Sequence, residues 1–214
     1  MKQIYYDEDD NMLISLPEEY AWVIVCALIL AIEYNLFGMI MNKTRMRLFN
    51  KEFMEKNFKA EHEAAFPGQA LPIMGFPDTV AGRYAMKLDY KDWTALNTAN
   101  RIHMNYFEMH VSLIVCTLLV GISWPLVAVI FALVHILARI AYLVLYYTKG
   151  PDARLPAAMF VLFTTFGLHL LAIASMINVA YLRGEDAKKL GAFSMGGGDD
   201  DYDDFDWEDE DWRR

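Results

Sequence analysis

The sequence is poor in cysteine, has no basic excess and carries none of the common catalytic signatures. Its two cysteines, Cys26 and Cys116, lie far apart, which gives neither a disulfide framework nor a C-x-x-C site. No H-E-x-x-H sequence, phosphate-binding loop or nucleophile elbow occurs. The formal net charge of −9 argues against a nucleic-acid partner. We therefore predict no metal site and no nucleic-acid binding.

The N-terminus also lacks the basic residues of a targeting segment. Four acidic residues at positions 7–10 precede the first apolar stretch, whereas secretory signals and mitochondrial presequences are basic. We therefore expect this stretch to remain as an uncleaved anchor. The organelle stays open between the endoplasmic reticulum and the mitochondrial membrane.

What the chain has in abundance is apolar sequence. Hydrophobic residues make up 56% of it, more than an ordinary soluble domain contains. A membrane-spanning helix needs about 20 mostly apolar residues, and four such stretches lie at Tyr20–Met41, Asn105–Trp124, Pro125–Thr148 and Ala157–Leu182. We predict an all-α, multi-pass integral membrane protein, folded in the lipid bilayer as a four-helix bundle.

The segments outside the bundle are polar. We predict an acidic N-terminal segment over 1–19, the bundle over 20–182 with an extended inserted loop at 49–93, and an acidic tail over 183–214. Residues 50–66 favour an amphipathic helix on the membrane surface. Gly196–Gly198 predicts a hinge before the tail, whose aromatic residues fit either a solvated segment or a motif that docks on a basic surface.

Basic residues are concentrated in the loops at 42–100 and 149–156, while the termini are acidic. Four spans place both loops on one side of the membrane. The positive-inside rule then puts these loops on the cytoplasmic or matrix side and both termini on the other.

Charged residues interrupt the second and third apolar helices. Arg101, Asn105 and Glu108 are four and three residues apart, so they share one helical face. Arg139 lies inside the third stretch, where an arginine is costly unless paired, and Glu33 and Glu108 are its available partners. Two interpretations stay open. One is a pocket for a polar molecule; the other is an internal salt bridge with an aromatic belt that needs no ligand.

Two segments resemble signatures of the MAPEG family, the membrane-associated proteins in eicosanoid and glutathione metabolism. Ala99–Glu108 is similar to the second-helix signature, which reads R-A-H-Q-N-x-x-E in the microsomal glutathione transferase type 3 group. Ala138–Pro151 is similar to the third-helix pattern of that group. The resemblance covers roughly residues 16–48 and 94–182.

This resemblance implies a homotrimer that binds glutathione between neighbouring subunits. It also implies that the glutathione thiol conjugates lipophilic electrophiles or reduces lipid hydroperoxides. The implied glutathione contacts, of which Arg45 serves the neighbouring subunit, are Arg45, Arg101, His103, Asn105, Glu108, Tyr142, Tyr146 and Arg154.

The chain departs from the family pattern where catalysis would occur. The family's catalytic basic residue follows the position of Arg45, but Met46 stands there, so Arg47 becomes the candidate catalytic residue. Val111 replaces a usual proline, and the loop before the second helix is longer than usual. Three functions remain open. The first is a glutathione transferase or peroxidase acting on lipophilic substrates, and the second is a catalytically degenerate accessory subunit of a larger membrane assembly. The third is a lipid-binding helper protein on the same fold, for which the sequence has no separate signature.

Overall fold

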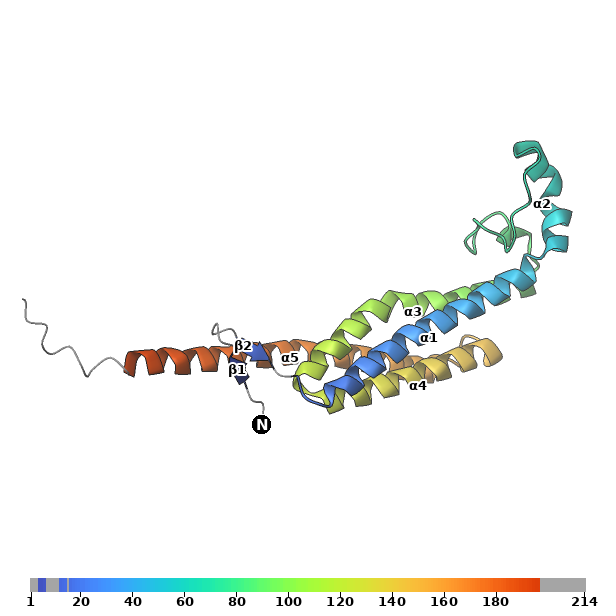
Figure 1. Cartoon of the computed structure of the whole chain (residues 1–214). Helices are drawn as coiled ribbons and strands as arrows, with labels where there is room; N and C mark the ends of the chain where they lie inside the picture. The colour runs from blue at the N-terminus through green and yellow to red at the C-terminus, as the bar shows by residue number, and fades with distance from the viewer. Residues whose placement is uncertain (1–3, 7–11, 15, 197–214) are drawn as a thin grey trace, which may run out of the picture. The chain divides into compact units, whose positions relative to one another are not determined.

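The computed structural model describes residues 4–6, 12–14 and 16–196, with side chains placed from 16 to 182. Four long helices dominate it (Figure 1). The inserted loop contains a shorter helix and one 3-10 turn. In chain order the elements are α1 (Tyr20–Leu48), α2 (Lys51–Ala65), η1 (Ala85–Lys87), α3 (Tyr90–Ser123), α4 (Pro125–Lys149) and α5 (Leu155–Gly196). The chain divides into two compact units, with the boundary inside α5 after Ser175.

Within the described residues, four helices are long and apolar enough to cross a bilayer: α1, α3, α4 and α5 as far as Leu182. Large apolar side chains point outward from them. Ile32 on α1 is 59% exposed and Leu137 on α4 is 66% exposed. Apolar side chains that face outward are compatible with the bilayer core, because it contains no water from which they must be shielded. The predicted all-α four-helix membrane fold is therefore confirmed.

Small and branched side chains fill the centre of the bundle. Gly121 of α3 allows the closest approach, because a Cβ atom there would lie 2.7 Å from Cγ1 of Val23 on α1. Small residues let membrane helices pack closely in this way. Both cysteines are buried and free, as expected. The core also contains Leu30, Leu113, Val120, Ala128, Ala132, Leu168 and Ala172.

The helices extend beyond the predicted spans at their polar ends. α1 continues past Met41 to Leu48, and α3 begins at Tyr90. Asp89 is the cap: its backbone is extended and its carboxylate accepts a hydrogen bond from the Asp92 backbone N–H at 2.8 Å.

The inserted loop folds around a small core of its own, and we call residues 49–89 the loop module. Phe49, Met54, Phe58 and Ala85 form this core, together with the flanking Leu48 and Leu96. Met54 and Phe58 are only 1% and 5% exposed. The predicted amphipathic helix is therefore present as α2, and Met54 and Phe58 of its apolar face pack inside the protein.

The N-terminal segment contains two short strands, β1 (Ile4–Tyr6) and β2 (Met12–Ile14). They pair antiparallel, with Ile4 opposite Ile14. Apolar and aromatic triplets on either side of a polar stretch are a hairpin signal that could have predicted this pair. At the other end of the chain, α5 stays helical to Gly196. The remainder of the predicted hinge and the acidic run lie outside the described residues.

Candidate functional site

A hollow of about 500 Å³ lies between the first half of α3 and the end of α4. Arg101 and Tyr146, two of the implied glutathione contacts, both line it. Trp93, Asn97 and Pro151 complete much of the wall. Ligand sites of small molecules usually enclose about 300–1,000 Å³, so this hollow is large enough for a small peptide.

The side chain of Arg154 is held against two phenols of α4. Its Nη1 donates a hydrogen bond to the Tyr142 hydroxyl at 2.9 Å, and its guanidinium lies 4.7 Å from the centre of the Tyr146 ring. Tyr142 is 2% exposed. The Nε of Arg154 is buried without a hydrogen-bond partner. The structure thus brings Arg154, Tyr142 and Tyr146 together, and of these three Tyr146 lines the hollow with Arg101.

Arg139 lies at the centre of a buried polar network. It is fully buried, and its Nη1 donates to Asn105 Oδ1 at 2.8 Å while its Nε donates to His135 Nε2 at 3.2 Å. The ring of Tyr106 stacks 4.6 Å from the guanidinium. Asn105 is therefore engaged with Arg139 rather than free for a ligand.

We expected Glu33 or Glu108 to pair with Arg139, but neither carboxylate is bound to it. Among residues 16–182, no carboxylate lies within ion-pair distance of Arg139. Glu33 is connected to it indirectly, because the Tyr106 hydroxyl donates to Glu33 Oε2 at 2.7 Å. Among the described residues, Arg139 therefore has no salt bridge, and the neutral side chain of Tyr106 connects it to Glu33 instead.

Two members of this network, Tyr106 and Thr164, were not singled out from the sequence. His135 Nδ1 and the hydroxyl of Thr164 on α5 share a hydrogen bond of 2.8 Å, so the network joins all four long helices. Tyr106 lies within the quoted second-helix signature, and its polar end in an apolar span was a usable signal. No comparable signal marked Thr164, because a threonine hydroxyl commonly donates to a backbone carbonyl of its own helix, as it does here to Phe160 O at 2.9 Å.

Arg101 and Glu108 differ from Arg139 in that neither side chain is directly bonded among the described residues, although the charge of Glu108 acts on Arg139. Both are exposed, and neither makes an ion pair or hydrogen bond within the part of the chain that the structure describes. They lie on a helix apolar enough to span a membrane. Charged side chains in such a place usually find a partner or water, so an internal salt bridge does not account for this pair.

The other implied contacts lie elsewhere. His103 is half-buried against α1, with its ring centre 5.1 Å from that of Tyr34. Arg45 is buried in the loop module, where it donates to Gly75 O at 2.7 Å and to Asp78 O at 2.6 Å. The structure does not bring either residue to the hollow within one chain.

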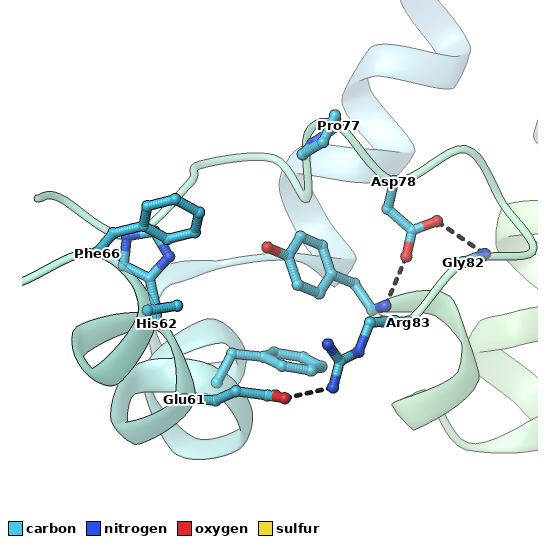
Figure 2. Close-up of a pocket in the computed structure, with 10 residues that line it drawn as sticks. Glu61, His62, Phe66, Pro77, Asp78, Gly82 and Arg83 are labelled. Atoms are coloured by element: carbon cyan, nitrogen blue, oxygen red, sulfur yellow. Dashed lines mark hydrogen bonds and ion pairs between the residues drawn. The ribbon is translucent and has the colours of Figure 1, made fainter.

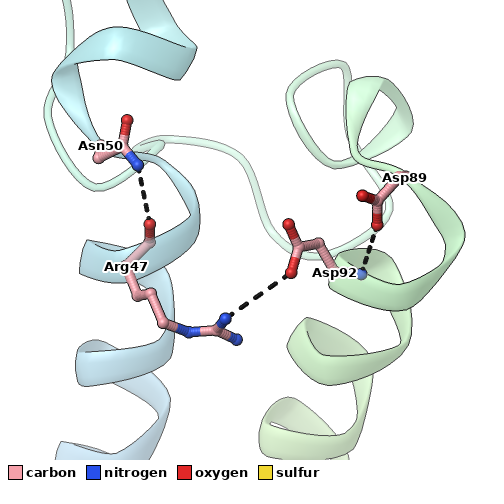
Figure 3. Close-up of polar contacts among 4 residues, drawn as sticks. All are labelled: Arg47, Asn50, Asp89 and Asp92. Atoms are coloured by element: carbon pink, nitrogen blue, oxygen red, sulfur yellow. Dashed lines mark hydrogen bonds and ion pairs between the residues drawn. The ribbon is translucent and has the colours of Figure 1, made fainter.

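Arg47, the candidate catalytic residue, is on the last turn of α1. Its Nη1 lies 3.7 Å from the carboxylate of Asp92 on α3, and both side chains are partly exposed (Figure 3). The backbone carbonyl of Arg47 also accepts a hydrogen bond from Asn50, which caps α2. The ion pair is long and solvated, so it restrains the guanidinium only weakly.

The loop module has a smaller pocket of about 280 Å³ (Figure 2). Phe66, His62 and Pro77 contribute rings to its wall, and Arg83 pairs with Glu61 across it. Asp78 accepts hydrogen bonds from the backbone N–H groups of Gly82 and Tyr84, at 2.9 and 2.5 Å, so its role is to shape the loop. This pocket is at the small end for a ligand site, and we take the hollow at Arg101 as the candidate site.

The comparisons with known proteins concern the family of the chain. Residues 23–174 match the family model described as MAPEG family. No curated protein matches the chain. The match includes all of α3 and α4, most of α1, the first part of α5, the inserted loop and every implied contact residue.

Proposed function

The chain belongs to the MAPEG family, and on that premise we propose that it binds glutathione at the hollow beside Arg101 and uses it on lipophilic compounds dissolved in the bilayer. The family as a whole is glutathione-related and membrane-embedded. The observation that carries the proposal is the pair Arg101 and Glu108, which are exposed opposite charges with no hydrogen bond or ion pair to the described residues, on a helix apolar enough to span a membrane. We further propose a homotrimer in the endoplasmic reticulum or mitochondrial membrane.

The residues present fit glutathione chemically. The tripeptide carries two carboxylates and one ammonium group. Arg101 and Arg154 are cations for the carboxylates, and Glu108 is an acid for the ammonium. Charge-assisted hydrogen bonds of this kind are about twice as strong as neutral ones. The unpartnered Nε of Arg154 is a donor that such a ligand would satisfy.

Bound glutathione supplies a thiol, whose ionised form is the nucleophile. This chain would contribute Arg47, because the family's basic position holds Met46, which carries no charge. A cation near a thiolate stabilises it electrostatically. The weak ion pair between Arg47 and Asp92 leaves the guanidinium able to take that role.

The binding proposal is tested with Arg101→Ala and Glu108→Ala. Each substitution is expected to weaken glutathione binding by roughly 10- to 100-fold, since a hydrogen bond to a charged group contributes about 1.5–3 kcal/mol. Both side chains are exposed, so helix content and thermal stability should not change. Isothermal titration calorimetry on the purified full chain measures the affinity, and circular dichroism checks the fold.

Lys91→Ala is the matched control, because it removes an exposed charge from the first turn of the same helix. It is expected to leave the affinity unchanged. If Arg101→Ala and Glu108→Ala behave like Lys91→Ala, the hollow is not a glutathione site. If either variant unfolds, the residue is structural.

Catalysis is tested separately with Arg47→Gln. We expect kcat for conjugation of a chlorodinitrobenzene to fall by roughly tenfold or more, because a transition-state charge loses one cation. The KM for glutathione should change by less than about twofold, since Arg47 lies outside the hollow. Asp92→Asn, which removes the counter-charge but keeps the cation, is expected not to lower kcat. An unchanged kcat in Arg47→Gln contradicts the catalytic assignment.

The loop module favours a second candidate, an accessory subunit that has lost catalysis. Arg45 is engaged with the loop's own carbonyls, and Met46 stands at the position that the resemblance gives to the family's catalytic basic residue. The test is the mass of the chain extracted from its native membrane in mild detergent. A larger assembly and no turnover in any conjugation or peroxidase assay would support this candidate, and an active homotrimer would remove it.

A further inference from the structure

A second concave surface lies between the C-terminal parts of α1 and α4, distinct from the hollow at Arg101. It is a groove of about 630 Å³. Ile40 of α1 and Leu143 and Val144 of α4 give it an apolar wall, while Lys43 and Arg47 are the cations on its lining. Both helices are long and apolar enough to span a membrane. An apolar wall next to two cations matches a molecule that has an acyl part and an anionic part.

The two cations are available to an anion. Lys43 is exposed and makes no ion pair among the described residues. Arg47 has only the 3.7 Å pair with Asp92, in which the side chains are 58% and 38% exposed. Exposed pairs contribute about 0–1 kcal/mol, so a ligand anion can compete with Asp92 at little cost.

The neutral groups on the lining leave one hydroxyl for a ligand. Thr44 donates to Ile40 O at 2.9 Å and Thr148 donates to Val144 O at 2.6 Å, so both threonine protons are used within their helices. Tyr147 is 55% exposed, and its hydroxyl makes no hydrogen bond to the residues whose side chains are described, 16–182. It is also the type of side chain that lies at the boundary between lipid and water.

The apolar wall continues along both helices. Leu36, one turn before Ile40, is 54% exposed. On α4, Ile140 is 45% exposed and Leu137 is 66% exposed, and they extend the surface of Val144 in steps of one turn. A free phosphate ion would make no favourable contact with this apolar surface, whereas an acyl chain would bury its methylene groups against it.

The geometry points to a binding site for an anionic phospholipid, whose phosphate contacts Lys43, Arg47 and Tyr147 and whose acyl chains lie along α1 and α4. Basic pockets between membrane helices on the cytoplasmic or matrix side recognise anionic headgroups in this way. That is the side on which the basic loops of this chain are predicted to lie. The assignment does not depend on glutathione binding.

Native mass spectrometry of the purified full chain tests the site, with phosphatidylglycerol, phosphatidylcholine and glycerol 3-phosphate as probes. We expect discrete binding of phosphatidylglycerol, weaker binding of phosphatidylcholine, and no measurable binding of glycerol 3-phosphate. Lys43→Gln should weaken the binding of phosphatidylglycerol by roughly fivefold, and the double variant Lys43→Gln with Arg47→Gln should weaken it by roughly 25-fold. These factors correspond to about 1 kcal/mol for each cation, at 1.4 kcal/mol per tenfold.

The matched control is Lys56→Gln with Lys59→Gln, which removes two exposed cations from α2 and leaves the groove intact. It should keep the preference for phosphatidylglycerol within about twofold of the unaltered chain. An equal loss in both double variants would overturn the site, because the preference would then reflect overall charge. Tight binding of glycerol 3-phosphate would overturn the lipid assignment. A changed oligomer mass in Lys43→Gln would also overturn it, since the groove would then be a seam between copies.

Discussion

Replacing Arg139 with alanine is expected to lower the free energy of unfolding by about 3–5 kcal/mol. The guanidinium is fully buried and donates to Asn105 and His135. Its removal leaves the buried His135 and the half-buried Asn105 without this donor, and it opens a cavity of side-chain size. Circular dichroism during unfolding in mixed dodecyl maltoside and dodecyl sulfate micelles measures the change.

Two further variants separate the causes of this loss. Arg139→Met fills much of the volume but restores none of the hydrogen bonds, so we expect it to recover only about 1–2 kcal/mol. Lys149→Ala removes an exposed cation from the same helix and is expected to stay within about 0.5 kcal/mol of the unaltered chain. A loss in Arg139→Ala no larger than in Lys149→Ala would show that the network does not stabilise the bundle.

The membrane-spanning helices could be located from hydropathy because lipid imposes one requirement on every span. Tyr20 and Pro125 begin α1 and α4 as predicted, and α4 ends one residue later than expected, at Lys149. The polar ends could not be located in this way. α3 starts at Tyr90 because Leu96 and Ala99 are buried by the loop module and the bundle, and this packing is a tertiary contact.

The candidate site was predicted in part. Helical spacing and the family signature located Arg101 and Tyr146, and the structure brings both to one hollow. The same spacing could not identify the partners of Arg139, since these depend on how each helix is rotated about its axis. The observed rotation places Asn105 and His135 within hydrogen-bond distance of Arg139. Glu33 instead accepts a hydrogen bond from Tyr106, which lies between Glu33 and Arg139.

Arg45→Ala is expected to open the loop module. The Nε of Arg45 donates to Met74 O at 3.0 Å, and its Nη2 donates to the carbonyls of Gly75 and Asp78. The guanidinium also lies 4.5 Å from the centre of the Phe76 ring. Alanine leaves all three carbonyls without this donor, and each buried acceptor left unpaired costs about 1–3 kcal/mol. Cleavage by trypsin within residues 67–87 should therefore become faster by roughly 100-fold or more, when the cleavage rate is proportional to the population of the opened loop module.

Arg47→Ala, two residues further along α1, is the matched control, because it removes an exposed arginine and is expected to leave cleavage within about threefold of the unaltered chain. Glutathione affinity, measured on the same variants, distinguishes the two roles that Arg45 has been given. If it holds the loop, Arg45→Ala exposes residues 67–87, and Arg45→Lys, which keeps the charge but not the forked donor, recovers only part of the protection. If Arg45 is instead the contact for a neighbour's glutathione, affinity falls while the loop stays protected. That outcome would contradict a structural role, because the three carbonyl bonds would then add nothing to the stability of the loop.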